Sequence, residues 1–206
     1  MSTKRTGYLF FTAFIAAILW FLTFIVKPMN FWLEMSISIL ILIFLAYFNK
    51  RDLFSLGKIK LRHIIIGIAS AAVLYLVFYI GNIISGYLFS FKDMQISMIY
   101  GNKAQGSLAL ISALLLFIIG PGEVLYWQGY IQTTLSGKLG ENLGYILSVL
   151  LYAAVHVATG NFMVILAALV CGLFWGWIYK KEKSLIPIII SHALWDVTIF
   201  VLLPMK

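Results

Sequence analysis

Long apolar runs separated by short polar breaks dominate the chain. A helix that crosses a bilayer needs about 20 predominantly apolar residues. The stretches that meet this requirement are Gly7–Val26, Phe31–Phe48, Ile64–Phe89, Leu108–Tyr130, Leu143–Ala158, Phe162–Tyr179 and Leu185–Leu203. The third is long enough to be tilted or broken near Gly81, and the fifth is short enough to extend through Thr159 to Asn161. The pattern predicts an all-α fold, a polytopic transmembrane helical bundle of about seven helices (six to eight).

Composition agrees with this pattern. Of the 206 residues, 63% are hydrophobic and 11% are charged, whereas soluble domains are usually about 45–50% apolar and about 25% charged. We therefore expect residues 1–206 to form a single integral membrane domain without an appended soluble domain. Lys4 and Arg5 precede the first run as in a signal peptide, but the run exceeds the usual h-region of about 7–15 residues and no small-residue cleavage site follows. We expect it to be retained.

The basic residues are distributed unevenly between the two sides of the predicted bundle. With a cytoplasmic N-terminus, eleven lie inside and four outside, the inner set being Lys4, Arg5, Lys50, Arg51, Lys58, Lys60, Arg62, Lys138, Lys180, Lys181 and Lys183, and the outer set Lys27, Lys92, Lys103 and Lys206. This is the positive-inside distribution. It accounts for the net charge of +8 without a nucleic-acid partner and predicts a multi-pass protein of the cell (plasma) membrane. The stretch from Lys50 to Arg62 is thus first a topology signal, with binding to anionic lipid as the alternative.

Ionisable residues inside the predicted spans are few. Glu123 lies in the fourth span, His156 in the fifth, and His192 and Asp196 in the seventh, four residues apart and so on one helix face. A charged group in mid-membrane costs at least a few kcal/mol and should face the bundle interior with a partner. Because three helices each supply such a group, we expect the four to converge. His63 and Glu34, near span ends, are expected to reach water.

The chemistry that such a set supports is the activation of water. A carboxylate enclosed by apolar walls suits general-base work, and an imidazole with an adjacent side chain can stabilise an oxyanion. Zinc is the alternative, with Glu123, His156 and His192 as acceptable ligands. Each residue also has a structural explanation, such as a hydrogen-bonded buried acid, a packed histidine, or a local His192–Asp196 pair.

Three short segments resemble the motifs of one family. The segment GEVLYWQGY at 122–130 resembles the first motif, EExxxRG, of the CAAX protease and bacteriocin-processing (CPBP, or Abi) family. The segment YAAVH at 152–156 is similar to its second motif, an aromatic residue four before a His, and SHALWD at 191–196 to its third, a His four before Asn or Asp. The resemblance covers about residues 108–203 and extends to the order and spacing of the motifs.

The resemblance implies an intramembrane endopeptidase acting on a peptide or membrane-protein substrate, as in relatives that trim prenylated CaaX tails. It implies that Glu123 and His156 activate water and that His192 and Asp196 steady the tetrahedral intermediate. It favours a metal-free glutamate mechanism, with a divalent metal such as zinc as the alternative. Other relatives act in bacteriocin self-immunity or as scaffolds, and oligomeric state is not implied.

The chain departs from the first motif at Val124 and Gln128, where the family has Glu and Arg. These positions are one helical turn apart, so an ion pair is replaced jointly by an apolar residue and a neutral amide, a change that need not destabilise a fold. A catalytically impaired scaffold or immunity protein is therefore the alternative function. A proton-coupled transporter is a third, although no inverted repeat accompanies the polar groups.

Several features have packing as their expected role. Gly172 and Gly176 give a GxxxG spacing, for which close packing within the chain is expected. Pro121 and Gly122 predict a break or kink before Glu123. The six tryptophans are expected mostly near span ends or on packing faces, Trp20 among them, and Cys171 is expected to be a packing residue. Counting along the spans places His156 nearer the outer side than Glu123, an offset of about 5–10 Å.

Overall fold

The computed structural model describes residues 3–205, with side chains described from Gly7 onward. Within this range all regular structure is helical. Six helices are long and apolar enough to cross a membrane, at Gly7–Val26, Phe31–Asn49, Leu61–Leu88, Leu108–Leu139, Glu141–Thr159 and Phe162–Glu182, and a shorter apolar helix follows at Ile186–Leu202. The predicted polytopic all-α bundle is confirmed. Lys206, counted above as an outer charge, lies outside the described residues, as do the side chains of Lys4 and Arg5.

The first three spans are α1 (Thr3–Phe21) with a π turn at Leu22–Val26, α2 (Phe31–Asn49) and α3 (Leu61–Leu88). Asn30 caps α2 by accepting hydrogen bonds from two backbone N–H groups, as this residue type does at helix starts. Of the two possibilities considered for the third span, a tilt or a break near Gly81, the break is absent, because α3 is one continuous helix. A glycine in a helix weakens it locally but does not by itself interrupt the backbone hydrogen bonds.

A short helix, α4 (Lys92–Tyr100), and a 3-10 turn (Gly101–Gln105) lead to the fourth span. That span consists of α5 (Leu108–Leu114), a π segment (Leu115–Ile119), α6 (Gly120–Val124), a longer π segment (Leu125–Gln132) and α7 (Thr133–Leu139). The expected break at Pro121 is absent, since the helix runs on and the departures from α geometry lie on either side of α6. Such π segments are often found at functional sites.

The remaining elements are α8 (Glu141–His156) with a 3-10 turn at Val157–Thr159, α9 (Phe162–Glu182), and α10 (Ile186–Val197) continued by a π turn at Thr198–Leu202. The extension of the fifth span through Thr159 is confirmed, and Asn161 begins the next helix as its N-cap. Only Gly140 separates α7 from α8, with a φ of 84° that favours glycine.

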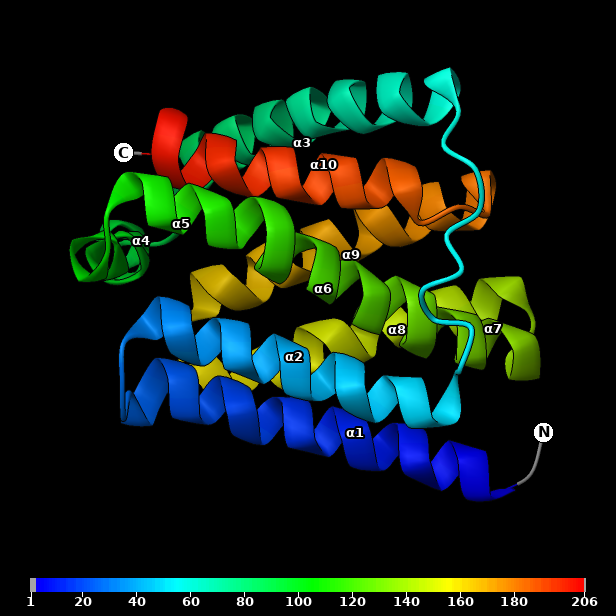
Figure 1. Cartoon of the computed structure of the whole chain (residues 1–206). Helices are drawn as coiled ribbons and strands as arrows, with labels where there is room; N and C mark the ends of the chain where they lie inside the picture. The colour runs from blue at the N-terminus through cyan, green and yellow to red at the C-terminus, as the bar shows by residue number, and fades with distance from the viewer. Residues whose placement is uncertain (1–2, 206) are drawn as a thin grey trace.

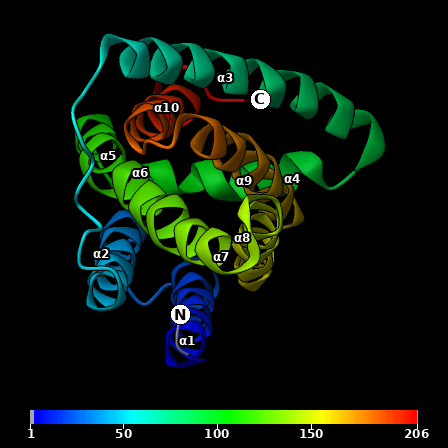
Figure 2. The same ribbon diagram turned by 90° about the vertical axis from the view of Figure 1, so that its right-hand side faces the viewer.

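Consecutive spans run in roughly opposite directions (Figure 1). The N-terminus, the α2–α3 loop, and the α7–α8 and α9–α10 turns lie at the right-hand end in that view, and α4 and the C-terminus at the left-hand end. Viewed from the right-hand end, the continuous α5–α7 helix lies among the other spans, while α3 covers one face and packs along α10 (Figure 2). The fourth span, which carries Glu123, is therefore central to the bundle.

Two polar residues that were expected to reach water are buried by protein. Glu34 is 6% exposed and His63 is 8% exposed, and among the described residues Glu34 Oε2 and His63 Nδ1 have no hydrogen-bond partner. Counting residues from a helix end gives depth along the axis only. The direction in which each side chain points about the axis decides whether it meets lipid, water or protein.

Candidate active site

All four predicted site residues line one cavity of about 430 Å³. Glu123 comes from α6, His156 from the end of α8, and His192 and Asp196 from α10, and each is 5–6% exposed. Most of the other lining side chains are aromatic or aliphatic. The expected convergence of these groups in the bundle interior is therefore present in the structure.

Gly122 brings the helix that carries Glu123 close to α2. A Cβ atom at this position would lie 2.1 Å from Ile39 Cγ2 and 3.1 Å from Ile43 Cδ1. Both distances are shorter than the roughly 3.5–4.0 Å at which carbon atoms pack. A side chain at position 122 would thus push α6 away from α2 and move the neighbouring carboxylate.

Tyr152 holds the Glu123 carboxylate. The phenolic hydroxyl donates a hydrogen bond of 2.8 Å to Oε2, and both side chains are buried. No other hydrogen bond of the Glu123 side chain is found among the described residues. One carboxylate oxygen is thus held by the protein, and the other remains for a water molecule or a substrate group.

Both ring nitrogens of His156 have partners. The Trp20 indole N–H donates a hydrogen bond of 2.9 Å to Nε2, and Nδ1 lies 2.7 Å from the backbone carbonyl oxygen of Tyr152. Trp20 is fully buried and packs edge-on against the imidazole, with ring centroids 5.6 Å apart. Trp20 lies on a packing face, as expected, and its N–H in addition contacts the candidate site.

His192 and Asp196 lie side by side on α10 but do not form a hydrogen bond with each other. His192 Nε2 lies 3.6 Å from Asp196 Oδ2, which is longer than a hydrogen bond. His192 Nδ1 is buried without a partner, and the imidazole stacks on Trp175 with ring centroids 3.7 Å apart. The ring is thus fixed by stacking, and the local hydrogen-bonded pair considered from the sequence is not formed.

The three residues considered as zinc ligands do not form a metal-binding cluster. Within residues 3–205, no three His, Cys, Asp or Glu side chains come close enough together to hold one ion. In addition, the Trp20 N–H occupies the Nε2 lone pair of His156, which zinc would require. In this arrangement, Glu123, His156 and His192 do not fit a zinc site.

The expected difference in depth between Glu123 and His156 is spanned by Tyr152. This residue precedes His156 by one helical turn in α8, its hydroxyl contacts Glu123, and its carbonyl contacts the His156 ring. Glu123 forms no hydrogen bond with either histidine among the described side chains. The long phenol side chain, rather than a tilted helix, connects the first and second motifs.

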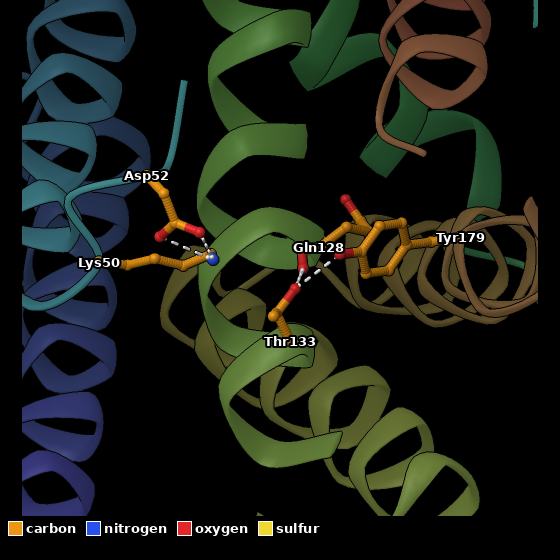
Figure 3. Close-up of polar contacts among 5 residues, drawn as sticks. All are labelled: Lys50, Asp52, Gln128, Thr133 and Tyr179. Atoms are coloured by element: carbon orange, nitrogen blue, oxygen red, sulfur yellow. Dashed lines mark hydrogen bonds and ion pairs between the residues drawn. The ribbon is translucent and has the colours of Figure 1, made fainter. Parts of the chain in front are cut away.

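Val124 and Gln128, where the chain departs from the first motif, lie outside the residues that line the cavity. Val124 is fully buried and Gln128 is 5% exposed. The backbone carbonyl of Gln128 accepts a 2.9 Å hydrogen bond from the Thr133 hydroxyl, which also lies 2.7 Å from that of Tyr179 (Figure 3). Because Val124 and Gln128 are buried outside the cavity, the departures from the motif lie in the structure that supports the site.

An ion pair lies beside the same helix, at the end of α2 (Figure 3). Lys50 Nζ is 3.0 Å from Asp52 Oδ1 and 3.1 Å from Oδ2. The hydrogen bond from Lys50 lowers the pKa of the Asp52 carboxyl below its usual value. Because Asp52 is largely exposed, this contact has little influence on the cavity.

Sequence reasoning missed the contributions of Trp20, Tyr152 and Trp175 to the site. Tyr152 was noted only as an aromatic position of the second motif, and the tryptophans only as packing or interface residues. Trp195 lines the cavity, whereas Trp127 packs against Tyr152 with ring centroids 4.9 Å apart. The signals that could have indicated Trp20 are its donor-only indole and the helix face that it shares with the polar residues Thr12 and Thr23.

Residues 105–198 match the model of a family described as type II CAAX prenyl endopeptidase Rce1-like. The match contains all four candidate site residues and Tyr152, but not Trp20. No curated protein and no solved structure matches the chain.

Proposed function

We propose that the chain is an Rce1-like type II CAAX prenyl endopeptidase, the family whose model residues 105–198 match, and that it hydrolyses a peptide bond inside the membrane with Glu123 as the base. The observation that carries the proposal is the convergence of four ionisable side chains from three helices on one largely apolar cavity. An apolar cavity admits an apolar peptide segment. Ionisable groups inside a membrane are energetically costly, so they are rarely present without a function.

The proposed reaction uses the side chains in the following order. Glu123 takes a proton from a water molecule as the water oxygen bonds to the substrate carbonyl carbon. His192 donates a ring N–H hydrogen bond to the oxyanion of the resulting tetrahedral intermediate, and Asp196 donates a second in its protonated form, because an ionised carboxylate can only accept. Glu123 then returns the proton to the leaving amine nitrogen as the carbon–nitrogen bond breaks. These reaction steps require no metal.

The alternative is a scaffold or immunity protein that retains the fold and binds a partner. It is favoured by Val124 and Gln128, which replace the charged residues of the first motif. A plasma-membrane location with a cytoplasmic N-terminus is proposed for either function, since the basic residues gather at the end of the bundle that holds the N-terminus.

The test is a peptidase assay on purified wild type and Glu123→Gln in detergent or proteoliposomes, with and without a chelator. Suitable substrates are peptides with an apolar segment, and a CaaX peptide pair with and without its prenyl group. Removal of a general base should lower kcat by about 10²–10⁴-fold. Glu34→Gln is the matched control, because Glu34 is also a buried acid but does not line the cavity.

Hydrolysis by wild type and Glu34→Gln, its loss in Glu123→Gln, and indifference to the chelator would support the proposal. Equal hydrolysis by wild type and Glu123→Gln would refute the role of this carboxylate. Inhibition by the chelator, reversed by zinc, would refute the metal-free mechanism. A wild type that cleaves none of the peptides, and whose cellular phenotype survives Glu123→Gln, would favour the scaffold.

A further inference from the structure

A second cavity, of about 250 Å³, lies at the end of the bundle onto which Figure 2 looks. It is bordered by the lower part of the fourth span, the start of α8 and the end of α9. Two lysines, one glutamate, one glutamine, a glycine and three hydroxyl-bearing side chains line it, and none of these residues lines the candidate active site. This polar cavity is therefore a separate site.

The cavity lies where the sixth span leaves the apolar part of the bundle. Tyr179 and Lys180 belong to the last turn of α9, and Lys183 follows that helix directly. Lysine side chains at the end of a span extend toward the lipid headgroups. With the proposed cytoplasmic N-terminus, this end faces the cytoplasmic leaflet, whose anionic lipids attract basic residues. The cavity is thus at the depth of the lipid phosphates.

The two lysines retain hydrogen-bond donors for a ligand. Lys180 Nζ donates to Asn142 Oδ1, and Lys183 Nζ pairs with the Glu141 carboxylate. An ammonium group has three donors, so one such contact leaves two on each lysine. Glu141 balances one of the two positive charges, which leaves one for a ligand. The lysines therefore suit an anion of single charge, and a phosphate diester is such a group.

The opposite wall of the cavity offers hydrogen-bond acceptors. The Thr133 hydroxyl donates to the Gln128 carbonyl, so in its 2.7 Å contact with Tyr179 it accepts the phenolic proton (Figure 3). Both protons are thus used within the protein, and the hydroxyl oxygens keep free lone pairs. Gln132 is 2% exposed, its Nε2 donates to the Gly176 carbonyl, and its Oε1 has no partner among the described residues. A ligand that also carries a donor would complement this wall.

The walls of the cavity are held by close helix packing. A Cβ atom at Gly144 in α8 would lie 2.3 Å from the backbone nitrogen of Ser136 in α7, and one at Gly176 in α9 would lie 2.8 Å from the Tyr145 ring. The three helices therefore meet without room to shift. A cavity that is already formed binds a ligand with little cost of reorganisation.

We propose that this cavity binds the headgroup of an anionic phospholipid, with the phosphate diester at Lys180 and Lys183 and a headgroup hydroxyl at Tyr179. A phosphoglycerol headgroup has this combination, because its diester carries one negative charge and its glycerol carries free hydroxyls. A phosphocholine headgroup lacks a hydrogen-bond donor and would bring a quaternary ammonium close to the lysines. The site is distinct from the basic α2–α3 loop, and it does not depend on the proposed peptidase reaction.

Native mass spectrometry of the purified full chain in detergent tests the headgroup preference. Dilauroyl phosphatidylglycerol and dilauroyl phosphatidylcholine, added separately in equal amounts, have the same acyl chains. The wild type should bind the first lipid about tenfold more tightly, and the double variant Lys180→Gln/Lys183→Gln should lose this preference. Lys58→Gln/Lys60→Gln is the matched control, since these two lysines lie at the same end of the bundle but are exposed outside the cavity.

Tyr179→Phe tests the acceptor wall by removing one oxygen atom. It should weaken binding of phosphatidylglycerol about three- to tenfold, the loss expected for one hydrogen bond. Binding of dilauroyl phosphatidic acid, whose phosphate carries no headgroup glycerol, should change much less. An equal loss for both lipids would overturn the placement of the hydroxyl at Tyr179.

Equal affinity of the wild type for phosphatidylglycerol and phosphatidylcholine would overturn the proposal. An equal loss of preference in the Lys58/Lys60 control would also overturn it, because general surface charge would then explain the binding. Glycerol 3-phosphate carries the same polar groups without acyl chains, and its binding as tightly as the lipid would make a soluble phosphate compound the ligand instead. If Lys180→Gln/Lys183→Gln does not fold, the response of the two lipids to Tyr179→Phe supplies the decision.

Discussion

The contact at Gly122 can be tested by adding a single methyl group. In Gly122→Ala, the new Cβ atom would lie 2.1 Å from Ile39 Cγ2, about 1.4 Å less than the roughly 3.5 Å at which carbon atoms pack. Ile39 is fully buried and cannot turn into lipid. The helices must separate or adopt strained rotamers, and overpacking of this kind costs about 1–3 kcal/mol. Because residue 123 is the next in the chain, peptidase activity should fall as well.

A double-mutant cycle with Ile39→Ala isolates this contact. Ile39→Ala alone should cost about 2–5 kcal/mol by leaving a cavity. In the double mutant, the added methyl group enters the space that Ile39 has vacated. The combined loss should therefore be smaller than the sum of the single losses, by an interaction energy of about 1–2 kcal/mol, within the range observed for residues in contact.

Cys171 supplies the assay. It is the single cysteine of the chain, lies in α9 and is 3% exposed, so a maleimide dye reacts with it when the bundle opens. Titration with SDS in detergent solution gives the free energy of unfolding of each variant. A thermal ramp ranks the variants by their unfolding temperature. Gly81→Ala is the control, since a Cβ atom there would meet nothing within 4 Å. Wild-type stability in Gly122→Ala, or strict additivity in the cycle, would refute the packing argument.

Three further predictions use the same preparations. Gly144→Ala should cost about 3 kcal/mol or prevent folding in the SDS titration, because its Cβ atom would lie 2.3 Å from the backbone nitrogen of Ser136, which cannot turn away; a loss below that of Gly122→Ala would contradict this. Asn161→Ala should cost about 1 kcal/mol, since Asn161 caps α9, whereas Asn161→Ser should recover most of it. The Lys50 contact lowers the pKa of Asp52, so it stabilises the fold above the usual carboxyl pKa, and this stabilisation is lost as pH falls through the lowered value. Lys50→Ala should therefore raise the midpoint of the Asp52 titration followed by NMR. An unchanged midpoint would contradict the pairing.

The sequence predicts the spans well, because each requires a long apolar run that few other structures need. The predicted Leu108–Tyr130 helix continues to Leu139, and the predicted Ile64 start moves to Leu61. These differences lie at polar ends, where water satisfies the backbone equally well inside or outside a helix. The break considered as one alternative at Gly81 is absent, since a glycine without an accompanying proline keeps its backbone hydrogen bonds in the helix.

The site was predictable only in part. Costly groups such as Glu123 and His192 have few places to go in a bilayer other than the bundle interior, so their meeting in one cavity follows from solvation alone. The facing of Trp20 could also have been inferred, because it shares one helix face with Thr12, Ala16 and Thr23, whose small or polar side chains are all buried. Glu34 and His63 were expected to reach water because only their distance from a helix end was considered, and not the direction in which their side chains point.

The role of Tyr152 was hidden for a different reason. Its contact with Glu123 depends on how far its side chain reaches across the bundle, and residue counting along helix axes gives no measure of that reach. Depth along the helix axes therefore suggested an offset between the first two motifs, and the Tyr152 side chain spans this offset.

The two glycines of α9 limit how copies of this protein can associate. Cβ atoms at Gly172 and Gly176 would lie 3.1 Å from the Tyr152 ring and 2.8 Å from the Tyr145 ring, so this small-residue stripe is covered within the monomer, as expected. A second protomer cannot use it as a dimerisation seam without displacing α8. Self-association in the bilayer would have to use outward-facing surfaces instead, and α3, only 22% of whose apolar window is buried, presents an extensive one.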